Sequence, residues 1–474
     1  MKYINYIILL LYIFLSACAV GPNFKKPAAP IDTSYTPEDN LTHFGTQQIN
    51  PHKKVSAVWW QEFASPTLNE LMCNAVKNNY TLDAMQQTVA QTQELVNAAY
   101  GALWPQIAMN VAVGGNRYGV ALFGPANFII PPYTFYEVGP SLTYVLDLFG
   151  ATQRTIEKQK ALADYQAQEY NAAYISLTGN IAITALSIAI LNDQIDTIRQ
   201  ISIEDEKNLA FVTEAFRLGS ATKLDVLTAQ TQLSSDNALL PELHQQLKVA
   251  QNALAVLMGC SVTTWQAPHF ALEHFRLPDE LPLTLPSELV RTRPDILAAE
   301  AQLHAASANI GIATANLYPN ITLTAATFQE ALNIPQLFNG ASNAWTYLAN
   351  VATPVFNGGM LRAQRRAALH AFDAAFSSYQ QIVLQAFAQV NDTLHALKHD
   401  EQTENLEKEV MLTAKNNVEL AEISFAAGGV GILEIINAQR QYKQAQTRYI
   451  QAKGQRYLDT VKLYLVLGGQ HPFR

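Results

Sequence analysis

The sequence predicts an internally duplicated α+β fold built from two very long helices and four short strands. Three observations support this prediction: a repeated order of motifs, two proline-free stretches with helical periodicity, and four stretches in which apolar and polar residues alternate. Each half of such a fold contains a helix, two strands, a very long helix, a glycine turn and a returning helix.

The duplication is visible as two pairs of matching motifs. Ala102-Leu103-Trp104-Pro105-Gln106-Ile107 matches Asn316-Leu317-Tyr318-Pro319-Asn320-Ile321, at an offset of 318 − 104 = 214 residues. The stretch from Phe216 to Gln230 matches the stretch from Phe425 to Gln439, at an offset of 428 − 219 = 209 residues. We therefore predict a first repeat at 66–258, a Pro-rich connector at 259–290, a second repeat at 291–468 and a tail at 469–474.

The N-terminus predicts an exported protein. Lys2 precedes a largely apolar run from Ile7 to Leu15, which is too short to span a membrane and is typical of a secretory signal. Leu15-Ser16-Ala17-Cys18 resembles the lipobox of bacterial lipoproteins. That resemblance implies a signal peptide at 1–17, an acylated Cys18 and a lipidated segment at 18–65, and Ala19 in place of Asp favours the outer membrane. The alternative is an ordinary signal with a chance cysteine.

The composition argues against several classes of protein. The chain of 474 residues has a formal net charge of −8 and no basic block, so nucleic acid is not an expected partner. Cys73 and Cys260 remain after Cys18, and whether they form a disulfide stays open. No other stretch is expected to reach the length of an apolar transmembrane helix, so a membrane crossing would require a closed β-barrel.

Two long helices are predicted from a coiled-coil pattern of apolar residues. The stretch 151–212 lacks proline and is rich in Ala, Gln and Glu, and about 62 helical residues would form a rod of roughly 90 Å. A second helix is predicted from about 362 to 424. The predicted seams consist of Tyr174, Leu177, Ile181, Ile188, Leu191, Ile195 and Ile198 in the first helix, with the small Thr184 between them, and of Val383, Phe387, Val390, Leu394 and Leu397 in the second.

The two returning helices are expected to differ at one position. Pro241 should break or kink the first returning helix, because proline lacks an amide hydrogen and clashes with the preceding turn. The equivalent position in the second repeat, 241 + 209 = 450, is Ile450, so that helix can continue.

Four stretches alternate as strands do. They are Gln106 to Val113, Glu137 to Asp147, Ile321 to Ala326 and Trp345 to Ala352, and Leu348 interrupts the polar face of the last. Either a half-buried soluble sheet or transmembrane strands would give this pattern. Four strands cannot close a barrel, whereas twelve strands from three chains can, so strands in a membrane would predict an oligomer.

The order of several motifs resembles that of the TolC-like outer-membrane factors, in particular the lipoprotein subgroup of multidrug (RND-type) efflux channels of the OprM and NodT type. The resemblance covers nearly the whole mature chain, and the segment from Arg291 to Ile296 is its most specific part. The other matching segments are Cys18 to Phe24, Trp59 to Phe63, Pro66 to Leu68, Leu285 to Leu289, Ala299-Glu300, Gly311, Tyr318-Pro319 and Pro354 to Gly359.

This resemblance implies a homotrimer with a twelve-stranded β-barrel in the outer membrane, continued by a long α-helical coiled-coil barrel in the periplasm. It implies the exit duct of a tripartite efflux pump that passively conducts small molecules such as drugs. The implied partners are a periplasmic adaptor, an inner-membrane transporter and outer-membrane lipid. No cofactor is implied beyond the acyl and diacylglycerol groups on Cys18.

The resemblance also assigns the glycine turns as the periplasmic tips that meet the adaptor. These turns contain Gly219-Ser220 in the first repeat and Gly428-Gly429 in the second. Small residues at a tip let another backbone approach closely. The alternative is that these glycines only end the helices.

Acidic residues just past the turns are candidates for a closed periplasmic aperture. By the resemblance, Asp225, Glu434 and Asn437 would contribute to it, with Arg217 as a bonding partner that holds it shut. Threefold symmetry would place each acid on a ring of three, where the carboxylates repel one another. Asn437 stands where many relatives have an acid, which weakens a double acidic ring. The alternative is a solvated helix face.

Other classes of protein fit the sequence less well. No nucleophile, phosphate-loop or zinc-protease motif points to an enzyme, and His269 and His274 lack acids placed to complete a metal site. A periplasmic coiled-coil lipoprotein would explain Cys18 and the long helices but not the four strands. A type I protein-secretion channel remains the nearest rival to drug efflux.

Overall fold

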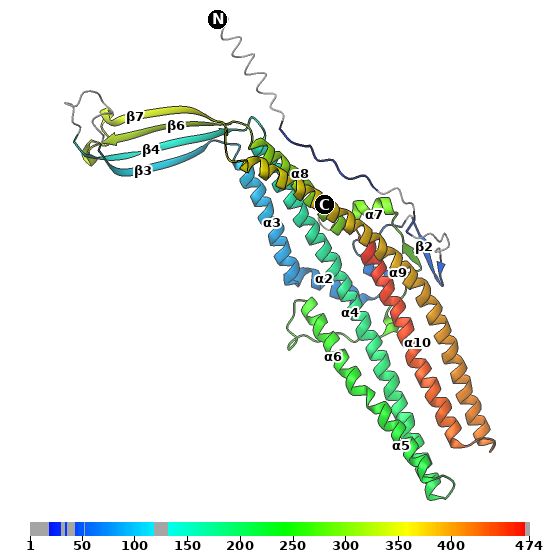
Figure 1. The fold of residues 1–474 in the computed structure, drawn as a ribbon. Coiled ribbons are helices and arrows are strands. Elements are labelled where there is room, and N and C mark those ends of the chain that lie inside the picture. Colours follow the sequence, from blue (N-terminus) through cyan, green and yellow to red (C-terminus); the bar gives the residue numbers. More distant parts are fainter. Residues whose placement is uncertain (1–18, 30–33, 36–42, 52, 118–130, 470–474) are drawn as a thin grey trace. The chain divides into compact units, whose positions relative to one another are not determined.

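A computed structural model describes residues 19–29, 34–35, 43–51, 53–117 and 131–469, and Figure 1 shows the fold. The predicted signal peptide at 1–17, Cys18 and nearly all of the predicted tail lie outside these residues. The chain forms two compact units. One comprises residues 1–27, 88–166 and 299–379, and the other comprises 28–87, 167–298 and 380–474. Each unit therefore takes parts of both sequence repeats, because the equivalent parts of the two copies pack together.

The first unit contains one antiparallel sheet of four strands in the order β3-β4-β6-β7 (Figure 1). The strands are β3 (Gln106–Asn116), β4 (Tyr133–Leu146), β6 (Asn320–Ala331) and β7 (Asn343–Ala352). All four predicted strands are confirmed, and each is at least as long as the alternation indicated. Pro140 lies inside β4, and the β4–β6 ladder skips Gly139 and Pro140 because proline offers no amide hydrogen.

The two long helices are α4 (Ala151–Arg217) and α9 (Met360–Ala426), each of 67 residues. Both predicted helices are confirmed, and the structure extends them at their ends. Most of the predicted seam is buried in both, and the rest is half-buried: Ile181, Ile188 and Ile195 in α4 are at most 2% exposed, as are Val390 and Leu394 in α9. The apolar 3- and 4-residue spacing therefore marks the face that packs in the protein.

The returning helices differ as Pro241 predicts. The first is divided into α5 (Lys223–Asn237) and α6 (Leu239–Leu257), and the break falls at Ala238. Pro241 lies in the first turn of α6, where its missing amide hydrogen would have had no partner within the helix. The second returning helix, α10 (Ile432–Leu467), runs without interruption through Ile450.

The second unit contains a small sheet that the sequence did not predict. β1 (His43–Phe44) pairs with β2 (Gln47–Asn50), and β2 pairs in parallel with β5 (Glu280–Pro282) from the Pro-rich connector. The second unit also contains packed aromatic side chains, with Trp59 stacked on Tyr464 at 5.3 Å between ring centroids.

The remaining helical elements of the two units are η1 (Trp59–Phe63), α2 (Pro66–Asn78), α3 (Tyr80–Gly101), η3 (Leu272–His274), α7 (Pro286–Thr292), α8 (Pro294–Ala315), η4 (Ile334–Gln336) and η5 (Gly340–Ser342).

One prediction about apolar stretches was wrong. α4 contains an 18-residue window with a mean hydropathy of 1.7, which is long and apolar enough to cross a membrane. However, 56% of that window is buried within the protein. A core helix has the same composition, so the buried seam of α4 explains the window without a membrane.

Candidate functional site

The register of the four-stranded sheet separates an apolar face from a polar one. Ile107, Leu142, Ala325 and Tyr347 are direct partners across the four strands, and partners opposite one another share a face. The next row, Ala108, Ser141, Ala326 and Thr346, consists of small and polar residues on the other face. Asn110 donates to the Ser141 hydroxyl at 2.7 Å on that polar face.

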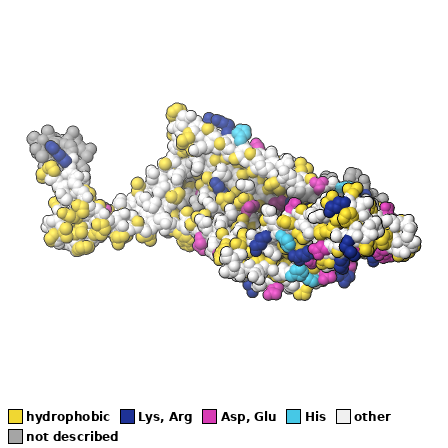
Figure 2. Space-filling view, turned by 90° about the horizontal axis from the view of Figure 1, so that it is seen from below, with side chains coloured by type: hydrophobic (Ala, Val, Ile, Leu, Met, Phe, Trp, Pro, Cys, Tyr) yellow, Lys and Arg dark blue, Asp and Glu magenta, His cyan; other side chains and the backbone are white. Residues whose placement is uncertain are grey.

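The apolar face is open to the outside of the chain. In β3 the side chains of Ile107, Met109, Val111 and Val113 are 67–75% exposed, and in β7 Trp345 and Tyr347 are exposed and stacked on each other. The charged residues of these strands are Glu137 and Glu330, which are register partners. In Figure 2 the strand sheet, at the left of the view, carries few charged side chains, whereas these gather over the helices. A large exposed apolar face indicates contact with a membrane or another protein.

Among the residues that the structure describes, both edges of this sheet are unpaired: β3 pairs with β4 and β7 with β6, and neither edge strand has a second partner. These edges are 11 and 10 residues long, and a long open edge offers a row of unused amide and carbonyl groups. The sheet is therefore suited to pairing with further strands from other chains.

The two glycine turns between the long and returning helices have the same geometry. Gly219 and Gly428 have φ values of +83° and +75°, which favour glycine. The amide of Ser220 donates to Ala215 O at 2.9 Å, and the amide of Gly429 donates to Ser424 O at 2.8 Å. These are Schellman caps at equivalent positions. All four predicted tip residues are exposed, and beyond the adjacent residues of the chain no described heavy atom lies within 4 Å of a Cβ built on Gly219 or Gly428.

Two of the four predicted aperture residues are engaged locally within the chain. Asp225 accepts from the amide and the hydroxyl of Thr222, at 2.7 and 2.8 Å, and closes a capping box at the start of α5. Both bonds lower the pKa of Asp225, and the bond from the Thr222 amide has the larger effect. Arg217 forms an ion pair with Glu214 at 2.5 Å on the same helix. Arg217 and Asp225 are thus not bonded to each other in one chain.

Glu434 and Asn437 lie together on an exposed face of α10. The residues between and beside them are buried on the other faces of the helix. Ile436 packs with Val212 of α4 and Val226 of α5, while Ile435 and Ala438 pack with Ala421 of α9. α10 is thus held between the two long helices near the turns, and it presents Glu434 and Asn437 outward.

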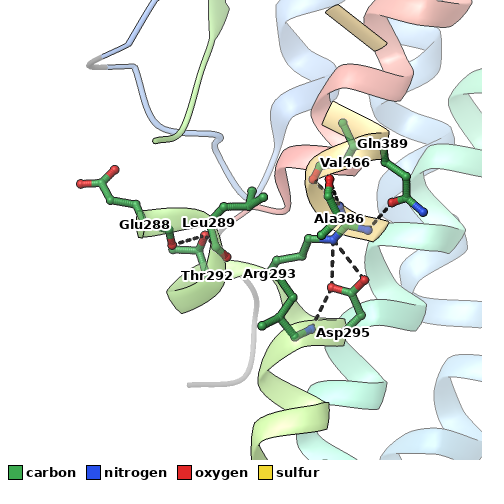
Figure 3. A network of polar contacts seen from close by, with 9 residues as sticks. Glu288, Leu289, Thr292, Arg293, Asp295, Ala386, Gln389 and Val466 are labelled. Carbon is green, nitrogen blue, oxygen red and sulfur yellow. Dashed lines mark hydrogen bonds and ion pairs between the residues drawn. The ribbon is translucent and has the colours of Figure 1, made fainter. Parts of the chain in front are cut away.

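The motif from Arg291 to Ile296 serves a structural role in the second unit. Figure 3 shows Arg293 at the centre of a network of polar contacts. Its Nε donates to both oxygens of Asp295, at 2.9 and 3.1 Å, and its Nη1 donates to Val466 O at 3.0 Å. Nη2 donates to Gln389. The buried guanidinium thereby links the start of α8 to α9 and to the end of α10.

The first described residues lie against the start of α4 and against α8 within the first unit. The amide of Val20 donates to Phe149 O at 3.1 Å, and Arg154 donates to Val20 O at 3.2 Å and to Asn23 Oδ1 at 2.8 Å. Further along, Phe24 stacks on His304 and Lys26 pairs with Glu300 at 2.8 Å. The residue that follows Cys18 is thereby fixed close to the end of β4.

The remaining candidates show no site of their own. Cys73 and Cys260 are free thiols, the first exposed and the second half-buried. His269 and His274 lie with ring centroids 6.4 Å apart. Within the described ranges, no group of three or more His, Cys, Asp or Glu side chains could hold a metal ion.

Comparisons with known proteins agree with this geometry. The family model described as "Outer membrane efflux protein" matches residues 71–260 and 285–469. A probable outer membrane lipoprotein, SilC of Salmonella typhimurium, is 27% identical, with 97% of each chain covered. The pyoverdine export outer membrane protein OpmQ of Pseudomonas aeruginosa is 28% identical, with 96% of each chain covered.

A solved structure of the outer-membrane channel OprN has the same fold. It superposes with a TM-score of 0.87 at 23% identity and covers 96% of this chain and 99% of that one.

Proposed function

This chain belongs to the outer membrane efflux protein family and is the outer-membrane channel component of an efflux pump, and we propose that three copies of it form the duct. In this proposal the strands of the three copies close a twelve-stranded barrel, and the long helices continue it as an α-helical barrel in the periplasm. The channel conducts small molecules passively, and it catalyses no reaction.

The observation that carries this proposal is the four-stranded sheet with one apolar face and two open edges. A membrane cannot satisfy the hydrogen bonds of an open edge, so β3 and β7 must pair with strands of other copies. If β7 of one copy pairs with β3 of the next, three copies contribute twelve strands. The apolar row that includes Ile107 and Tyr347 then contacts lipid, and the row that includes Ser141 and Thr346 lines the lumen.

The two Schellman turns are the surfaces that we propose for the periplasmic adaptor. Gly219, Ser220, Gly428 and Gly429 are exposed, and there is open space beside Gly219 and Gly428. A helical hairpin of the adaptor could therefore approach the backbone closely. The inner-membrane transporter supplies the energy and binds the substrate.

The face of α10 that carries Glu434 and Asn437 supports a closed aperture near these turns. Both side chains point away from the buried contacts of α10. Threefold symmetry would bring three copies of each together, and Asp225 and Arg217 on the neighbouring helices would add to the ring. Arg217 would have to exchange Glu214 for a partner on another copy to hold the aperture shut.

We also propose that Cys18 carries the lipid anchor. The contacts of Arg154 with Val20 and Asn23 support this, because they fix the segment that follows Cys18 beside the end of β4. The acyl chains would then enter the membrane next to the barrel.

Fractionation and gel electrophoresis test the proposal. We expect the protein in the outer membrane as a heat-modifiable trimer, and we expect cells that lack it to accumulate small toxic compounds. Cys18→Ala should remove the acyl mass while the trimer still forms. A protein that is not heat-modifiable and that leaves the membrane once Cys18 is replaced would favour a periplasmic coiled-coil lipoprotein. Loss of secreted protein without a change in drug accumulation would favour type I secretion.

A further inference from the structure

A buried charged cluster lies where α4, α5 and α10 meet in the second unit. The Lys443 ammonium of α10 donates to Asp205 Oδ1 of α4 and to the carbonyl of Ile201, each at 3.1 Å. Lys443 and Asp205 are both 6% exposed. Glu204 lies 3.6 Å from the same ammonium, but its side chain is 53% exposed, so water screens it. The Lys443–Asp205 pair is thus the main ionic contact that holds α10 against α4.

A second carboxyl group approaches Asp205 from a different helix. Asp205 Oδ2 is buried and has no hydrogen-bond partner among the groups that the structure describes. The carboxyl of Asp236, at the end of α5, lies within hydrogen-bonding reach of Asp205 and is itself held by Gln232 at 2.8 Å. Two carboxyl groups that meet without a donor between them favour sharing one proton.

The surroundings of the pair allow a proton to enter. A cavity of about 290 Å³ lies beside the break between α5 and α6 and is lined in part by Asp236, Lys443, Arg440 and Arg448. Arg448 is paired with Glu407 of α9 at 3.1 Å. Burial is the main cause that raises the pKa of Asp205 to about 6, and the Asp236 carboxyl adds to the rise, while Lys443 opposes it. Asp205 can therefore change its charge near neutral pH.

We propose that Asp205 and Asp236 form a proton-binding site that switches Asp205 between two helices. Without the proton, Asp205 is an anion and its partner is Lys443 of α10. With a proton taken from water, the Asp205 hydroxyl donates to Asp236 of α5, and the ion pair with Lys443 is lost. One protonation thus strengthens the contact between α4 and α5 and weakens the contact between α4 and α10.

The consequence for the channel rests on the proposed function. Nearer the turn, α10 remains held to α4 by Asn208, which donates to Gln439 at 2.7 Å, and by the contact of Ile436 with Val212. The face that carries Glu434 begins on the same helix, only nine residues before Lys443 (443 − 434 = 9). Acidification therefore loosens α10 where it presents the proposed aperture residues, and it favours the open channel.

Single-channel recording of the full-length protein in planar bilayers tests this switch. We expect the open probability of the wild type to rise about tenfold between pH 7.5 and pH 5, because a buried cation then loses its partner. Asp205→Asn should be open at both pH values, since Asn cannot pair ionically with Lys443. Asp236→Asn should shift the response to lower pH, because Asp205 then lacks its like-charged neighbour. The matched control is Asp196→Asn, an exposed aspartate on the same helix, which should titrate as the wild type does.

A crosslink separates the switch from other effects of pH. In a background with Cys73 and Cys260 replaced by serine, Asn208→Cys and Gln439→Cys are oxidised at neutral pH to tie α4 to α10. The crosslinked channel should lose its response to acid, and reduction should restore it. A wild type that conducts but does not respond to pH, or an Asp205→Asn variant that titrates normally, would overturn the switch. A folded protein without any conductance would instead overturn the proposed channel function.

Discussion

The two turns between long and returning helices share a backbone geometry but use equivalent residues differently. In the first turn Thr222 and Asp225 form a capping box. In the second turn the equivalent positions, 222 + 209 = 431 and 225 + 209 = 434, are Gly431 and Glu434, and Gly431 has no side chain to form a cap. Asp225 is therefore occupied in starting α5, whereas Glu434 starts no cap and stays exposed. The two repeats thus share the turn, but only in the second is the acid, Glu434, available for a contact outside its own helix start.

The two returning helices also differ, since only the first is broken. Ile450→Pro would transfer the break to α10, where it removes a hydrogen bond in mid-helix and should destabilise the protein by about 3 kcal/mol or more. The converse change, Pro241→Ala, should alter the stability by less than about 1 kcal/mol, because position 241 lies in a first turn. Thermal unfolding followed by circular dichroism measures both. Equal effects of the two changes would contradict the account.

The second turn offers two adjacent glycines with different backbones. Gly428 has a φ of +75°, whereas Gly429 has no positive φ. Gly428→Ala should therefore cost about 1–2 kcal/mol of stability, since a side chain at positive φ is strained. Gly429→Ala is the matched control and should cost much less. Chemical denaturation of the two variants checks the difference, and a larger loss in the control would show that the turn is not built as described.

Each half also joins its long helix to its returning helix through a pair of carboxyl groups. In the second half the pair is Asp400 and Asp459. Burial is the main cause that raises the pKa of Asp400 to about 7, and the Asp459 carboxyl adds to the rise. Lys462 at 2.6 Å and Gln455 at 2.7 Å hold Asp459 in place.

A raised pKa means that the folded state keeps a proton that the unfolded state loses between about pH 4 and pH 7. The free energy of unfolding should therefore fall as the pH rises through that range. Asp400→Asn should flatten this dependence and raise the stability at pH 8 by on the order of 1 kcal/mol, after allowance for solvent screening. Asp392→Asn, at an exposed position of the same helix, is the control. Melting temperatures across the pH range would decide, and an unchanged slope for Asp400→Asn would count against the pair.

The smallest effects concern the two acids next to the turns. Asp225→Ala should speed amide hydrogen exchange several-fold in the first turn of α5, because the capping box opens. Glu434→Ala should leave exchange in the first turn of α10 nearly unchanged, because Glu434 closes no cap there. Faster exchange in both turns would show that the equivalent acids have the same role.

The sequence was most informative where periodicity repeats over many residues. The seam in α4, the alternation in β3 and the break near Pro241 depend on local spacing, and the structure confirms each. Thr222 and Asp225 also have the spacing of a capping box, so the local role of Asp225 was visible in the sequence. The resemblance to the channel family instead assigns Asp225 to the aperture, and the capping box shows its role within one chain.

The parts that could not be predicted depend on contacts between distant segments. β2 and β5 are strands of four and three residues, about 230 positions apart, and β5 ends in a proline. Neither has enough length for a clear alternation. Lys443 and Asp205 are 238 residues apart, and only the packing of α10 against α4 brings them together. A single sequence contains no signal for such pairs.

Ion conductance of the purified protein in a planar bilayer tests the central claim, that this chain forms a gated outer-membrane duct. At neutral pH we expect rare openings in the wild type, and larger, steadier openings when Asp225→Ala and Glu434→Ala are combined. Most of that change should come from Glu434→Ala alone, because Asp225 is engaged by Thr222. Equal conductance of the wild type and the double variant would remove the proposed aperture. The absence of conductance from a folded trimer would contradict the duct itself.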